Sequence, residues 1–123
     1  MRLNLIWLPT MLAGCFSELR SIDGDWAGAC TIDNAEFIEI PFALALEEFD
    51  DGWLEGGGSF TYKEINYEGP VYGDRIFDEI EIVLDGANEG QATRMEIEGE
   101  LESDVIVGEC AFFGVEGELV MGR

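Results

Sequence analysis

Carboxylates are the side chains of this sequence with the greatest capacity for chemistry, because the chain holds 27 Asp and Glu residues and no histidine. Two adjacent pairs, Glu47/Glu48 and Asp50/Asp51, have the residue types of a glycosidase acid and base. In a chain this acidic, however, such pairs arise from composition alone. The absence of histidine excludes Ser-His-Asp and Cys-His catalysis and histidine-based zinc or iron sites. The sequence therefore predicts a protein that is not an enzyme.

Calcium is the ion that best suits carboxylate-rich chains, because it prefers oxygen ligands. The candidate ligands are Asp23/Asp25 and Asp50/Asp51, but no EF-hand spacing surrounds either pair. We therefore predict no metal site and no cofactor. The formal net charge of −21 also excludes nucleic acid as a partner, since phosphates would be repelled.

The N-terminal fourteen residues have the layout of a secretory signal, with Arg2 followed by a short apolar core and small residues. The apolar part is shorter than the roughly 20 residues that cross a bilayer as a helix. Leu12-Ala13-Gly14-Cys15 resembles the lipobox of bacterial lipoproteins. The resemblance implies cleavage before Cys15, acylation of that residue and anchoring in the cell envelope. We predict the outer membrane or cell surface in preference to the inner membrane, although Phe16 does not decide between them. The alternatives are an ordinary secretory signal and a buried first segment.

The other two cysteines, Cys30 and Cys110, form an even pair in an exported chain, where disulfides persist. We predict a disulfide between them, and the alternative is two separate buried thiols. Such a bridge would bring the first expected strand close to the seventh.

Apolar and polar residues alternate with a period of two after the N-terminal segment, most clearly over residues 95–101, where every even position is glutamate. This pattern indicates strands with one buried face and one wet face. We expect strands near residues 24–32, 36–47, 53–63, 65–73, 75–84, 91–101, 105–113 and 117–122. Turns are expected at Asp50–Gly52, Glu68–Pro70, Gly73–Asp74, Asp85–Gly86, Ser103–Asp104 and Gly114.

The predicted fold is all-β, a small antiparallel meander of about eight strands that forms a barrel or a barrel-like sandwich. Pro41 belongs at an edge or a bulge, which argues against perfect closure. Asp78 lies on an apolar face between Ile76 and Ile80, which indicates a bulge, a barrel mouth or a shift of register. Aromatic side chains could line a cavity or simply fill the core, and an eight-stranded barrel permits either.

Gly24-Asp25-Trp26 and Arg123 are similar to a feature of the lipocalin and avidin group, in which the first strand carries G-x-W and a late basic residue packs across that tryptophan. The resemblance implies structural roles for Gly24, Trp26 and Arg123, with the guanidinium on the indole face. Alternatively, Trp26 is an ordinary core residue and Arg123 a solvated terminus.

The sequence thus predicts a cleaved signal at 1–14, a lipidated tether at 15–23 and one barrel-like domain at 24–123. The predicted function is that of a monomeric, membrane-anchored exported lipoprotein, a non-catalytic binding or structural module of the cell envelope with an envelope protein or a small apolar ligand as partner. The alternative is a lipocalin-like carrier, which would need an internal cavity of roughly 300 Å³ or more. A filled interior with an exposed aromatic patch favours the module.

Overall fold

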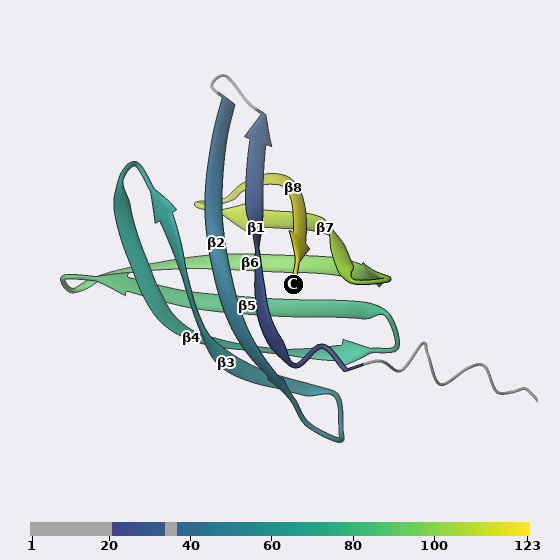
Figure 1. Cartoon of the computed structure of the whole chain (residues 1–123). Coiled ribbons are helices and arrows are strands. Elements are labelled where there is room, and N and C mark those ends of the chain that lie inside the picture. Colours follow the sequence, from purple (N-terminus) through teal and green to yellow (C-terminus); the bar gives the residue numbers. More distant parts are fainter. Residues whose placement is uncertain (1–20, 34–36) are drawn as a thin grey trace, which may run out of the picture.

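The computed structural model describes residues 21–33 and 37–123. It is an all-β structure in which each strand pairs antiparallel with the next and the first pairs with the last, so the prediction of a barrel is confirmed (Figure 1). Within these residues, no helix of a length and apolarity suited to crossing a membrane occurs. The strands are β1 Gly24–Asp33, β2 Phe37–Glu48, β3 Trp53–Tyr62, β4 Ile65–Ile76, β5 Glu79–Asn88, β6 Gln91–Glu102, β7 Val105–Phe112 and β8 Val115–Gly122.

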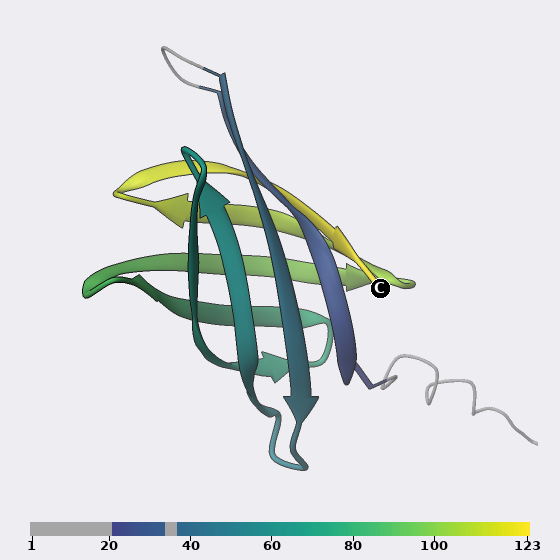
Figure 2. The same ribbon diagram turned by 60° about the vertical axis from the view of Figure 1, so that its left-hand side comes forward.

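Strands β1–β3 run at a steep angle to β5–β7, and β4 and β8 bend between the two directions (Figures 1 and 2). The two ends of the barrel differ in what they carry. We call the end that holds Ser21–Asp23, the connections 49–52, 77–78 and 103–104, and the C-terminal Arg123 the proximal end. The opposite end, with the turns at 63–64, 89–90 and 113–114, is the distal end.

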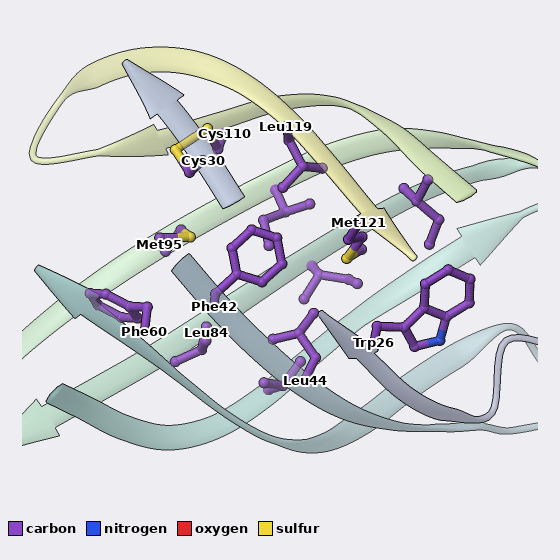
Figure 3. Close-up of a cluster of buried hydrophobic side chains, with 14 of the residues drawn as sticks. Trp26, Cys30, Phe42, Leu44, Phe60, Leu84, Met95, Cys110, Leu119 and Met121 are labelled. Atoms are coloured by element: carbon purple, nitrogen blue, oxygen red, sulfur yellow. A yellow bond between two sulfur atoms is a disulfide. The ribbon is translucent and has the colours of Figure 1, made fainter. Parts of the chain in front are cut away.

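Alternating side chains build the core, as the period-two pattern predicts. In β6, Met95 and Ile97 point inward and are at most 1% exposed, while Glu96 and Glu98 face solvent. Figure 3 shows side chains from all around the barrel, including Phe42, meeting in one interior. Burying a large apolar side chain contributes about 1.5–3 kcal/mol, so this interior is the main source of stability.

The turn predicted at Gly73–Asp74 is wrong. The chain instead reverses at 77–78, and Gly73 lies inside β4 opposite Ile82. A Cβ at Gly73 would lie 1.9 Å from the Glu81 carbonyl oxygen, so glycine serves here for close strand approach rather than for a turn. The later turn also resolves the position of Asp78, which lies in the turn itself.

The turns predicted at Glu68–Pro70 and Asp85–Gly86 are also wrong, because both segments lie within strands. Gly86 faces inward, where a Cβ would come within 2.8 Å of the Phe60 ring. The turn between β5 and β6 is at Glu89–Gly90, and both of these residues have positive φ. The predicted turns at Asp50–Gly52, Ser103–Asp104 and Gly114 are confirmed.

Pro41 does not prevent closure, contrary to the prediction. It pairs with Ala29 of β1, whereas pairing of β2 with β3 begins only at Phe42. On the β3 side, the segment that contains Pro41 is therefore locally an edge, where a residue without an N–H is tolerated.

The predicted disulfide is confirmed: Cys30 of β1 and Cys110 of β7 are bonded, with a Cα–Cα distance of 5.9 Å (Figure 3). Strand β8 lies between β1 and β7 in the sheet order. The two strands approach each other across Gly117 of β8, where a Cβ would lie 2.3 Å from the Thr31 carbonyl oxygen. The bridge therefore crosses the seam at which the barrel closes.

Candidate functional site

Side chains fill the interior of the barrel. Ile40, Leu84 and Met95 come from three strands and are all 0% exposed. A hollow that admits water would expose the side chains around it, so these residues border no such hollow. A groove of about 480 Å³ lies instead on the outer wall, lined in part by the exposed Ala27 and Ala43. The grooves found in the described residues therefore lie on the wall of the barrel and not around Ile40, Leu84 and Met95.

Aromatic side chains gather at the distal end. The rings of Phe112 and Phe113 have centroids 4.4 Å apart, and Tyr62 lies 4.8 Å from Phe112 and 5.8 Å from Phe113. The Lys63 ammonium lies 5.3 Å from the centroid of the Tyr62 ring. Phe113 is 64% exposed, so this cluster reaches solvent. We call Tyr62, Phe112 and Phe113 the distal aromatic patch.

Contacts between aromatic rings anchor the patch to the core of the barrel. Phe60 stacks on Tyr67 at 5.2 Å and meets Phe112 edge to face at 5.3 Å. Contacts of this kind are worth about 0.5–1.5 kcal/mol beyond area burial. Phe113 holds a left-handed backbone, with φ of 54°, which is unusual for a bulky residue. A rigid base thus presents an exposed phenylalanine at a hairpin tip.

At the proximal end, Glu48 joins three parts of the chain. Its Oε1 accepts hydrogen bonds from the Ile22 amide at 3.0 Å and from Arg75 Nη1 at 3.0 Å. Arg75 Nε in turn donates to the Phe77 carbonyl oxygen at 2.6 Å. The Arg75 and Glu48 side chains are only 4% and 20% exposed. Ile22, which the sequence places in the tether, is buried in the core.

Arg123 lies over Trp26 at the same end, as the sequence resemblance implies. The guanidinium carbon is 4.6 Å from the ring centroid, within the range of a cation–π contact. Arg123 also donates hydrogen bonds to the carbonyl oxygens of Ser21 and Asp23, while the Trp26 indole donates to the Ile22 carbonyl at 2.8 Å. The two residues therefore fix the segment through which the chain joins the barrel.

A row of carboxylates crosses the outer wall from β4 to β8. Asp74 lies opposite Glu81, Glu81 opposite Glu98, Glu98 opposite Glu109, and Glu109 opposite Glu118. All but the last line a groove of about 390 Å³. Like charges directly opposite each other destabilise a sheet. We call these five residues the acidic row.

We expect Glu98→Gln to raise the free energy of unfolding by a few tenths of a kcal/mol at low salt, because Glu98 faces a carboxylate on both sides. The gain should disappear near 1 M salt, where the Debye length falls to about 3 Å. Urea unfolding at both salt concentrations measures this effect. Glu39→Gln is the matched control, since Glu39 lies opposite neutral Thr31. A destabilised Glu98→Gln protein would contradict the prediction.

A polar network lies on the outer wall between β4, β5 and β6. The Tyr72 hydroxyl donates to Asp85 Oδ2 at 2.7 Å, and Arg94 Nε donates to Asp85 Oδ1 at 2.9 Å. The hydrogen bond from Tyr72, followed by that from Arg94, lowers the pKa of Asp85, and the bond to Asp85 raises the pKa of Tyr72. Both pKa values move away from neutrality, whereas acid–base catalysis needs a pKa near the working pH. The network thus has the character of a structural link.

Two of the four carboxylates considered as calcium ligands, Asp23 and Asp51, accept hydrogen bonds from the backbone. Asp23 Oδ1 accepts a hydrogen bond from the Glu48 amide, and Asp51 Oδ1 accepts one from the Trp53 amide at 3.0 Å. Over the two described segments, no group of three or more Asp, Glu and Cys side chains is arranged to hold a metal ion. Cys15 lies outside the described residues. The distal aromatic patch and the Glu48–Arg75 pair were not among the sequence predictions.

Comparison of the chain with protein-family models, with curated proteins and with solved structures finds no match. The surface features above therefore carry the functional assignment.

Proposed function

We propose that this protein is a membrane-anchored exported lipoprotein that acts as a non-catalytic binding module of the cell envelope. Acyl chains on Cys15 hold it at the outer membrane or cell surface, and the monomeric barrel binds an envelope protein through the distal aromatic patch. The observation that carries this proposal is a buried hydrophobic core combined with the exposed Phe113, which stands on the partly buried Tyr62 and the buried Phe112 at the end opposite Ser21–Asp23.

The position of the patch favours binding away from the membrane. The chain joins the barrel at the proximal end, so a lipid anchor upstream of residue 21 leaves the distal end directed outward. An exposed aromatic side chain such as Phe113, held on a base of packed rings, is typical of sites that bind other proteins, because it buries a large area at small entropic cost. The acidic outer wall keeps the rest of the barrel soluble.

Cys15→Ser is expected to abolish acylation, and with it the stable association of the protein with membranes. Intact mass spectrometry of the wild-type protein should give a chain that begins at Cys15 and carries acyl groups, because two or more acyl chains are needed for stable anchoring. The variant should lack that added mass and move out of the washed membrane fraction. Ser17→Ala, two residues away, is the control. A wild-type protein with its leader intact and an unmodified Cys15 would refute the proposal.

Native mass spectrometry distinguishes a binding module from a lipocalin-like carrier of a small ligand. A carrier purified under mild conditions would bring a small apolar molecule with it, whereas the filled interior leads us to expect the mass of the acylated chain alone. Phe113→Ala should weaken binding to an envelope partner without changing anchoring.

A further inference from the structure

Exposed hydrophobic side chains are present on all three connections of the proximal end. Phe49 in the β2–β3 connection and Trp53 directly after it are 41% and 39% exposed. Ile76 and Phe77 at the β4–β5 turn are 67% and 76% exposed, and Val105 after the β6–β7 turn is 37% exposed. We call these five residues the proximal rim. A hydrogen bond of 2.8 Å from the Arg75 amide to the Gly52 carbonyl oxygen joins the first two connections.

The rim lies beside the point where the chain joins the barrel. Glu48, which precedes Phe49, accepts hydrogen bonds from the Ile22 amide and from Arg75, and Arg75 holds the Phe77 carbonyl. The N-terminal segment and the turn that carries Ile76 and Phe77 are thus fixed to the same carboxylate. A restraint on the N-terminal segment therefore also restrains the position of the proximal rim.

The length of the tether limits how far the rim can be from an anchor at Cys15. Five residues, 16–20, separate Cys15 from Ser21, and even fully extended they span about 20 Å. Strand β2 alone has 12 residues and extends about 40 Å at 3.3 Å per residue. The tether therefore holds the proximal end, not the distal one, next to the bilayer.

We propose that the proximal rim docks on the bilayer surface that holds the Cys15 acyl chains, so that the barrel stands on the membrane in one orientation. The inference rests on the proposed lipid anchoring. Trp side chains favour the headgroup level of bilayers, and Phe side chains are common on the apolar faces of segments that lie in that layer. The one polar atom of the Trp53 ring is satisfied by a hydrogen bond of 2.7 Å to Glu55. The partner is a lipid surface without net charge, because Asp50, Asp51 and Asp78 on the same connections repel anionic headgroups.

The test uses Trp53 as a built-in probe. After cleavage before Cys15, the tryptophans of the chain are Trp26 and Trp53, and Trp26 is 1% exposed. The full-length protein is processed in cells, its acylation is verified by intact mass, and it is reconstituted into phosphatidylcholine vesicles with brominated acyl chains. We expect quenching of Trp53 fluorescence, protection of Trp53 from aqueous acrylamide, and weaker quenching when phosphatidylglycerol is added. Trp53→Phe should remove the signal.

Two variants discriminate docking from simple tethering. The double variant Ile76→Ser/Phe77→Ser should lose most of the bromolipid quenching while it stays acylated and folded, because both side chains are largely exposed. Phe113→Ser is the matched control, since Phe113 is 64% exposed, holds a similar left-handed φ of 54° and lies at a distal hairpin tip. An acylated protein whose Trp53 is open to acrylamide and not quenched by bromolipid would overturn the docking and leave the anchor in place. Equal losses in both variants would also overturn it, and an unacylated protein would refute the proposed function itself.

Discussion

Replacing Cys30 and Cys110 with alanine is expected to lower the free energy of unfolding by about 4–5 kcal/mol. The bridge joins residues 80 apart in sequence. In the chain-entropy model, closing a loop of this length lowers the conformational entropy of the unfolded chain, which stabilises the folded state by this amount. Domains of this size are stable by about 5–15 kcal/mol. The loss would therefore be a large fraction of the total stability. Guanidinium unfolding measures it.

The loss of stability should be greatest where β1 pairs with β8 and closes the barrel. Strand β1 pairs with β8 only from Ala27 to Thr31, a shorter run than its pairing with β2 from Gly24 to Asp33. Amide hydrogen exchange in the double variant should accelerate most in β1 and β8, because local opening follows the least supported region. Wild-type protein unfolded under reducing conditions is the control and should approach the variant. A loss below about 1 kcal/mol would contradict the chain-entropy estimate.

The fold is largely predictable from the sequence because its dominant signal is local. Alternation in segments such as 95–101 marks both the strand and the buried face. Turns are less predictable, since glycine occurs here both in turns and inside strands, where it allows neighbouring parts of the chain to approach closely. Gly73 and Gly86 lie inside strands where a Cβ would collide with a neighbouring strand or ring, whereas the reversal at Phe77 uses a residue that rarely adopts positive φ.

The candidate surfaces depend on contacts between distant parts of the chain, which a single sequence does not display. Glu48 and Arg75 are 27 residues apart, and Tyr62 meets Phe113 only once the barrel has closed. One signal was present: Arg75 shares the inward parity of Val71 and Gly73, and a cation on an inward face needs a carboxylate partner. That signal can be used only if the turn is placed at 77–78, because a turn at Gly73–Asp74 would put Arg75 at the start of the next strand.

Arg75→Met is expected to lower the free energy of unfolding by about 3–5 kcal/mol, the cost of breaking a buried ion pair by removing one partner. The side chains of Arg75 and Glu48 are 4% and 20% exposed, so the charge of Glu48 would be left mostly desolvated. Arg75→Lys should not restore the loss, since a lysine lacks the planar fork that lets Arg75 hold Glu48 and the Phe77 carbonyl together. Urea unfolding at fixed ionic strength measures both variants.

A double-mutant cycle with Glu48→Met separates the pair from its surroundings. If the cost comes from an isolated charge, then Glu48→Met/Arg75→Met should be less destabilised than the sum of the two single variants, by about 1 kcal/mol or more. The remaining loss in the double variant would come from the Ile22 amide and the Phe77 carbonyl, which lose their partners. Additive single effects would instead mean that Glu48 and Arg75 act separately, and the ion pair would then not be what fixes the N-terminal segment to the β4–β5 turn.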